Sequence, residues 1–187
     1  TESKQIEICL NGCEQGHCVI DFSLGIDLGG DEASSERTQA EFEHLSKFQD
    51  MGITEYDHEY VSWNMVEPTA PNGSTHAYNW EELDLFVQKV ETLGGTLNFT
   101  LMPDAKWAVE ETDSIAAAPK ETYICSQDNP DMSMDCWEAW TDFVAAVTER
   151  YDNDGINDMP DLQNAHNYLQ IGTEFENEGQ WNTASGY

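Results

Sequence analysis

Apolar and polar positions along the chain predict short strands that are each followed by an amphipathic helix. The run CVIDFSL (18–24) is rich in β-branched and aromatic residues and stops at Gly25, so it predicts a first strand. Thr38 and Glu41 then form a capping box, and apolar residues recur at helical spacing until Gly52. The first repeat is therefore a strand followed by a helix.

The same order is expected twice more. Residues 53–58 are polar for a strand, but they lie where the alternation requires one. The run TLNFTLM (96–102) predicts a further strand, which Pro103 ends. Between these two strands, Asn79 and Glu82 form a second capping pair ahead of an apolar helical stripe.

A last repeat begins where Asp135 and Glu138 cap a helix with a broad apolar stripe, and it ends in the run YLQIG (168–172) as a strand. Roughly four repeats of this kind imply parallel strands with helices packed against them. No glycine-rich phosphate loop follows any of the strands, which counts against a nucleotide-binding fold and favours a (β/α)8 barrel.

A complete barrel of this type takes about 250 residues, whereas the chain has 187 residues. The expected fold class is therefore α/β, with parallel (β/α) repeats that form half of a TIM-type barrel. We expect two parts: a cysteine-containing segment over 1–17 and the N-terminal half of the barrel over 18–187.

The charge of the chain excludes several classes of partner. Its 37 Asp and Glu residues against 7 Lys and Arg residues give a formal net charge of −30. Such a surface repels phosphate backbones and anionic headgroups, so we expect neither nucleic acid nor a membrane surface as partner. No apolar run approaches the ~20 residues of a membrane-spanning helix. The acidity favours a salt-rich, halophilic habitat, and the alternative is an acidic surface that keeps an extracellular protein in solution.

The five cysteines lie at positions 9, 13, 18, 125 and 136, without a C-x-x-C pair. Thiolate-bound metal is therefore not expected. A disulfide can close the loop between Cys125 and Cys136, and two of the three N-terminal cysteines could form another. Disulfides would place the protein in an oxidising compartment, secreted or at the cell surface. Five reduced, buried cysteines in a cytosolic protein are the alternative.

Carboxylates and tryptophans gather directly after the predicted strands, where parallel α/β proteins carry their working residues. Aromatic faces stack on the C–H faces of sugar rings, and carboxylates bind hydroxyls and move protons. The pattern predicts a carbohydrate site, although core packing is the alternative for each tryptophan and is favoured for Trp137 and Trp140. The candidate residues are Trp63, Asn64, Asp104, Lys106, Trp107, Thr173, Glu174, Glu178 and Trp181.

The order of five motifs carries a resemblance to a known group of enzymes. They are WNMVEP (63–68), YNWEELD (78–84), LMPDAKWA (101–108), a helix-and-loop motif from Trp140 to Pro160, and YLQIGTE (168–174). Together they resemble the first half of a clan A glycoside hydrolase, similar to the β-galactosidase and xylosidase-like barrel families. In that clan the fourth strand ends in Asn-Glu, and the Glu is the general acid/base of a retaining O-glycosidase. The resemblance implies this role for Glu174, with Glu178 as the alternative register.

Departures from the clan limit what the resemblance implies, among them Asp57 at the end of the second strand, where related barrels often have Arg. Position 173 is Thr where the clan has Asn. A retaining mechanism also needs a second carboxylate about 5 Å from the first, which the clan supplies from its seventh strand, and these residues contain no such strand. This chain alone is therefore expected to be inactive. It is either the first half of a secreted glycoside hydrolase or a non-catalytic extracellular protein, carbohydrate-binding or self-assembling as a homo-oligomer through open sheet edges.

One acidic loop raises the question of a metal. The segment DNDGIND (152–158) has the carboxylate density and the central glycine of a calcium loop, but it lacks the final Glu of an EF-hand. Asp152, Asp154 and Asp158 are thus candidate calcium ligands, while a structural turn is the favoured interpretation. We expect no other metal and no cofactor.

Overall fold

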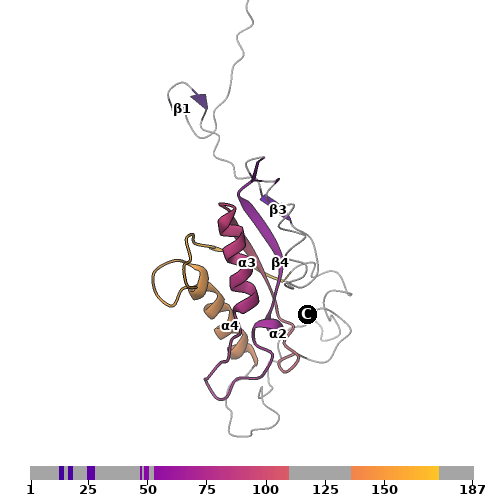
Figure 1. The fold of residues 1–187 in the computed structure, drawn as a ribbon. Helices are drawn as coiled ribbons and strands as arrows, with labels where there is room; N and C mark the ends of the chain where they lie inside the picture. The colour runs from indigo at the N-terminus through magenta and orange to yellow at the C-terminus, as the bar shows by residue number, and fades with distance from the viewer. Residues whose placement is uncertain are drawn as a thin grey trace, which may run out of the picture.

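The computed structural model describes residues 13–14, 17–18, 25–27, 47, 49–50, 53–109 and 136–172. The described strands form a two-stranded antiparallel sheet and a four-stranded parallel sheet, with helices beside the parallel one (Figure 1). The elements are β1 (Cys13–Glu14), β2 (His17–Cys18), β3 (Gly25–Asp27), β4 (Glu55–Ser62), α2 (Trp63–Val66), α3 (Glu81–Thr92), β5 (Thr96–Met102), α4 (Cys136–Tyr151) and β6 (Tyr168–Ile171).

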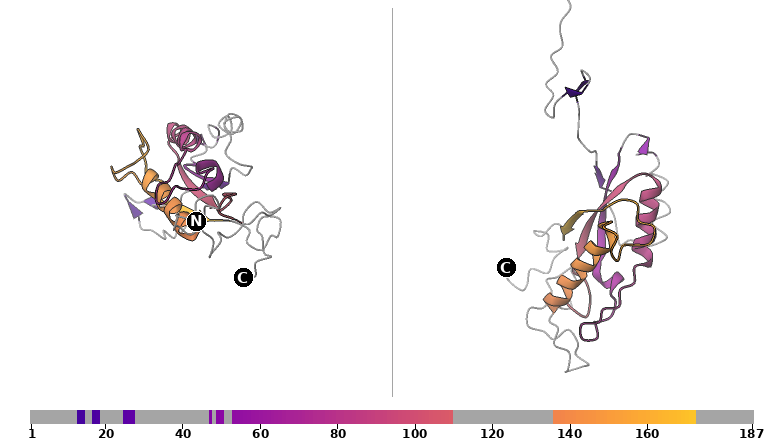
Figure 2. Two further views of the ribbon diagram at one scale, coloured as in Figure 1. Left: turned by 90° about the horizontal axis from the view of Figure 1, so that it is seen from below. Right: turned by 90° about the vertical axis from the view of Figure 1, so that its left-hand side faces the viewer.

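The parallel sheet follows the order of the chain, β3-β4-β5-β6. Each crossover therefore moves in the same direction, and the right-handed rule then puts the connecting helices on one face of the sheet. Two views at right angles agree that α3 and α4 cover the same face (Figures 1 and 2). A doubly wound sheet would instead reverse its strand order at a switch point. The expected α/β class with parallel strands is confirmed.

The core lies between this face and the two helices. Alternate residues of β5 (Leu97, Phe99 and Leu101) are buried against the helices, as a strand period of two requires. They meet one apolar stripe from each helix, and burial of each large side chain stabilises the fold by about 1.5–3 kcal/mol. The residues of α3 and α4 in the core are Leu83, Phe86, Val87 and Val90 of α3, and Cys136, Ala139, Trp140, Phe143, Val147 and Tyr151 of α4.

An ion pair and a tyrosine hydrogen bond join the two helices. Arg150 donates through Nε to Oδ1 of Asp84 at 2.8 Å and through Nη2 to the other carboxylate oxygen. Tyr151 donates its hydroxyl to Asp84 Oδ1 at 2.8 Å, and burial, followed by the charge of Asp84, raises the pKa of Tyr151. The phenol therefore stays a neutral donor, and α4 is fixed on α3 by three hydrogen bonds.

The structure corrects the expectation for the first strand. Cys18 belongs to β2 and pairs with Cys13, whereas the strand that pairs with β4 is β3, which starts at Gly25. The expected strand over 18–24 therefore has its boundaries wrong, and residues 19–24 lie outside the described residues. Gly25 begins a strand because its pairing with the edge of β4 fixes its backbone, which a local apolar pattern does not reveal.

Strand β4 is longer than expected because it contains an irregularity. It runs on to Ser62, and its register against β5 shifts between His58 and Val61. Tyr56 and Val61 both join the core although five positions separate them, an odd spacing that a regular strand would put on opposite faces. The shift lies beyond residue 58, so the strand continues past the expected segment with its alternation broken.

The later expected elements are present, with differences in detail, whereas the helix expected between Thr38 and Gly52 lies largely outside the described residues. Helices α3 and α4 and strands β5 and β6 occur where the periodicity places them. The N-cap of α3 is Trp80, which makes no side-chain cap bond. Asn79 still accepts the N–H of Glu81 through its Oδ1 at 3.3 Å, but its own N–H donates to the carbonyl of Val66, so the reciprocal bond to Glu82 does not form. Trp140 is buried as expected, whereas Trp137 is 40% exposed and does not belong to the core.

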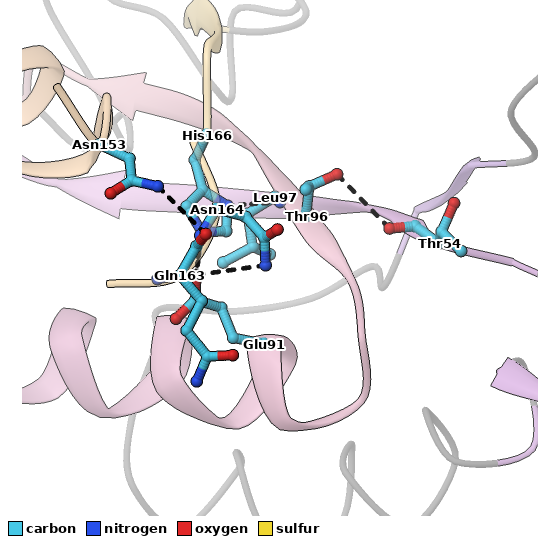
Figure 3. A network of polar contacts seen from close by, with 8 residues as sticks. All are labelled: Thr54, Glu91, Thr96, Leu97, Asn153, Gln163, Asn164 and His166. Carbon is cyan, nitrogen blue, oxygen red and sulfur yellow. Dashed lines mark hydrogen bonds and ion pairs between the residues drawn. The ribbon is translucent and has the colours of Figure 1, made fainter. Parts of the chain in front are cut away.

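A buried polar cluster anchors the connection from α4 to β6. Glu91 Oε1 accepts hydrogen bonds from the backbone N–H groups of Gln163 at 2.9 Å and Asn164 at 2.7 Å (Figure 3). His166 Nδ1 accepts the N–H of Leu97 at 2.9 Å, and its Nε2 lies 3.5 Å from Glu91 Oε1. Burial lowers the pKa of His166, although the charge of Glu91 acts in the opposite direction.

This cluster predicts a loss of stability in mild acid. Because the pKa of His166 is lower in the folded chain than in the unfolded one, the unfolded chain binds the proton more readily. The contribution of His166 to stability is therefore complete above the ordinary histidine pKa of about 6.5 and is lost as the pH falls below it. His166→Asn keeps an oxygen acceptor for Leu97 without a titrating ring, so it should remove this part of the pH dependence.

The measurement is the free energy of unfolding in urea between about pH 8 and pH 5.5 for both proteins. The other titrating groups are common to the two chains, so the difference between the two pH profiles isolates His166. Parallel profiles would contradict the assignment.

Candidate functional site

The carboxyl ends of the parallel strands meet at one edge of the sheet, which we call the carboxyl edge. Ser62 at the end of β4 is paired with Met102 at the end of β5, and Ile171 at the end of β6 is paired with Leu101. Gly172 continues this pairing, because its N–H donates to the carbonyl of Leu101 at 2.8 Å. The chain therefore leaves β6 at the same level as the turns that follow β4 and β5.

Four candidate residues follow β6 in the sequence. Thr173 and Glu174 come directly after Gly172, and Glu178 and Trp181 follow them. All four lie outside the described residues. Their roles therefore stay predictions, while the described chain up to Gly172 fixes the edge from which this segment starts.

Asp104 holds the turns after β4 and β5 together. Its Oδ2 accepts a hydrogen bond from Ser62 Oγ at 2.5 Å, and its Oδ1 accepts one from the backbone N–H of Asn64 at 2.9 Å. Asn64 Oδ1 in turn accepts the N–H of Lys106 at 3.3 Å. Three expected site residues are thus brought together at the carboxyl edge. Both carboxylate oxygens of Asp104 already bind protein groups, which favours support of the turns over direct contact with a sugar.

Trp63 lies in the core, and no face of its ring is free to stack on a sugar. The side chain is fully buried. Its ring centroid lies 4.7 Å from that of Trp107, 5.2 Å from that of Trp140 and 5.8 Å from that of Phe143. The structure therefore supports the core-packing alternative for Trp63. Trp107 is half-buried beside it and donates its indole N–H to the carbonyl of Glu67 at 2.8 Å.

A buried carboxylate that the sequence did not single out lies beneath this edge. Glu67 is fully buried, and its Oε2 accepts the indole N–H of Trp63 at 3.0 Å. Its Oε1 lies 2.7 Å from Nδ1 of His76, whose Nε2 lies 3.3 Å from Oδ2 of Asp142 in α4. The ring of Tyr78 stacks on His76 with centroids 5.1 Å apart. We call these residues, Glu67, His76 and Asp142, the histidine bridge.

The histidine bridge is suited to structure rather than to proton transfer. Carboxylate oxygens accept hydrogen bonds, so the geometry is fully satisfied when both ring nitrogens of His76 donate. Burial, then the charges of Glu67 and Asp142, raise the pKa of Tyr78, so this phenol also stays neutral. The oxygens of Glu67 and Asp104 all have protein partners in this arrangement.

The acidic loop lies at the opposite edge of the sheet, because it follows α4, and α4 runs back from the carboxyl edge. One oxygen from each of Asp152, Asp154 and Asp158 lies within 4.8 Å of the others, so the expected grouping is present. Backbone N–H groups also bind this cluster: Gly155 donates to Asp158 at 2.7 Å and Ile156 donates to Asp154 at 2.8 Å. These bonds support the structural turn, and calcium binding stays a prediction.

Only one of the two cysteines of the expected disulfide is among the described residues. Cys136 is fully buried at the start of α4 and is disulfide-bonded. Cys125 lies outside the described residues. The pairing of these two cysteines therefore stays a prediction.

Comparison of the chain with protein-family models, with curated proteins and with solved structures finds no match. Among the described residues, no helix combines the length and the apolar character needed to cross a membrane.

The histidine bridge yields a stability prediction with an internal control. His76→Phe retains a ring to stack on Tyr78 but removes the partner of a fully buried carboxylate. Loss of a hydrogen-bond partner of a buried group costs about 1–3 kcal/mol. Asp142 is 47% exposed, so Asp142→Asn should cost less than about 1 kcal/mol.

Urea unfolding of the two variants measures this difference. His76→Gln, which keeps one donor, should fall between them. Equal losses of stability in His76→Phe and Asp142→Asn would show that burial of Glu67 does not depend on His76.

Proposed function

We propose that the chain is the N-terminal half of the catalytic barrel of a secreted glycoside hydrolase, which cleaves glycosidic bonds of oligosaccharides or polysaccharides with retention. The observation that carries the proposal is the sequential parallel sheet β3-β4-β5-β6, from which the chain emerges towards Glu174 at the carboxyl edge. Three of the motifs that resemble glycoside hydrolases begin in or directly after β4, β5 and β6, and the other two lie at α3 and α4. Working residues of such barrels lie at the carboxyl edge.

The exposed side chains of β6 support an incomplete barrel. In the described sheet β6 is the last strand, and its Tyr168 and Ile171 are 69% and 43% exposed. An edge strand with large exposed apolar side chains and an unused ladder of backbone groups is a template for another strand. In a barrel the next parallel strand pairs at this position and a further helix covers the outer face.

The proposed reaction uses two carboxylates and a water molecule. Glu174 protonates the leaving oxygen while a carboxylate from the second half of the barrel attacks the anomeric carbon, which forms a glycosyl-enzyme. Glu174 then removes a proton from water as the water displaces that carboxylate. In this scheme Asp104 and Ser62 act as positioning residues, since they hold the turns that flank the sugar.

The role of Glu174 is tested in the complete polypeptide that carries the downstream strands. Glu174→Gln should lower kcat by about 10²–10⁴-fold, the usual contribution of a general acid/base. Glu178→Gln is the matched control and should retain near-normal turnover of an oligosaccharide. A large loss in Glu178→Gln instead would favour the alternative register, and normal activity in both variants would overturn the proposed function.

A second candidate function rests on the same exposed strand. A non-catalytic, self-assembling extracellular protein would satisfy the edge of β6 with another copy of this chain. It predicts that the 187-residue chain forms a defined oligomer in solution.

Light scattering of two single variants tests this alternative. Ile171→Lys puts a charge on β6 and should dissociate the oligomer. Leu85→Lys changes a residue of similar exposure, 39%, on α3, and should leave the oligomer intact. A monomeric parent chain would exclude self-assembly through β6.

A further inference from the structure

The two-stranded sheet β1-β2 brings two cysteines to one register position. Cys13 is paired with Cys18, and Glu14 is paired with His17, in an antiparallel arrangement. Only residues 15–16 separate the inner pair in the sequence. The two strands are thus joined by the shortest common hairpin connection.

The register also determines whether the two cysteines are a hydrogen-bonded or a non-hydrogen-bonded pair of the antiparallel ladder. In a four-residue turn the first carbonyl accepts a hydrogen bond from the fourth N–H, so Glu14 and His17 are the hydrogen-bonded pair. Hydrogen-bonded and non-hydrogen-bonded pairs alternate along an antiparallel ladder, which makes the cysteines a non-hydrogen-bonded pair with Cα atoms about 4.5 Å apart. Disulfides require Cα separations of about 4.4–6.8 Å.

The short length of the hairpin also favours a covalent link between its two strands. Each of its strands has two residues. A two-stranded hairpin is marginally stable at best in water, so strands as short as these need a further constraint. A covalent bond between Cys13 and Cys18 supplies such a constraint without longer strands.

We propose that Cys13 and Cys18 form a disulfide that closes this hairpin. The sulfur–sulfur bond forms as the two thiols transfer two electrons and two protons to a disulfide oxidant such as oxidised glutathione, whose own sulfur–sulfur bond breaks to give two thiols. Because Cys136 is already disulfide-bonded, Cys9 and Cys125 are then the two candidate partners for it within the 187 residues. This inference is independent of the proposed function.

Peptide mapping of the full chain tests the pairing directly. The protein is folded in a glutathione redox buffer, denatured without reduction in the presence of an alkylating reagent, and cleaved after glutamate. Cleavage after Glu14 separates Cys13 from Cys18, so the disulfide alone holds the two peptides together until a reductant is added. Cys9 and Cys13 share one peptide, and fragmentation of the linked species shows which of them carries the bond.

The expected result is a linked species whose bond maps to Cys13 and persists in Cys9→Ser. Alkylated Cys18 in the parent protein would overturn the proposal. So would a bond that maps to Cys9 and disappears in Cys9→Ser. Since the readout is the covalent bond itself, Cys9→Ser serves as a control even if its stability is reduced.

Discussion

The parallel ladder between β4 and β5 is the constraint on which the rest of the structure depends. It extends from the pair Glu55 and Thr96 to the pair Ser62 and Met102, with one shift in register on the way. Because the ladder fixes which residues of β5 face the helices, it also fixes the positions of α3 and α4. The same ladder sets the two strand ends level, so that Asp104 can reach back to Ser62.

Two buried carboxylates, one near each end of this ladder, are stabilised in a similar way. Glu67 is buried near the carboxyl edge and Glu91 near the opposite edge. Each carboxylate accepts N–H donors and lies beside a histidine, His76 in one case and His166 in the other. In a chain with a formal charge of −30, these two carboxylates differ from the solvated ones because removal of their partners would leave a buried charge unpaired. Both fix loops to helices, which a purely apolar contact would do with less directional precision.

The sequence was sufficient to predict the elements whose hydrophobic periodicity is regular. It was insufficient to predict the ends of elements that tertiary contacts determine. Strand β5 and helices α3 and α4 show the expected spacing, and their buried faces follow from it. The ends of β3 and β4 were wrong, because a three-residue strand and a register shift leave no local pattern.

The candidate site was predicted in part for a similar reason. Asn64, Asp104 and Lys106 do come together, since parallel strands end at one edge. The bridge from Glu67 to His76 and Asp142 spans nine and then 66 positions of the chain, and a lone histidine gives no signal of such a contact. Burial of Trp63 likewise depends on where α4 packs, which a strand-end motif does not contain.

Solvent exposure of the parallel sheet differs between its central strands and β6, the last described strand. On the face away from the helices, Thr100 and Met102 of β5 are 3% and 1% exposed, and Tyr60 of β4 is 9% exposed. The sheet is therefore covered on both sides at β4 and β5, as parallel sheets usually are. On β6 the cover ends, since Tyr168 is 69% exposed. Among the strand residues whose exposure is described, large apolar side chains are exposed on β6, and a sheet that is buried at its centre and open at this strand is suited to extension there.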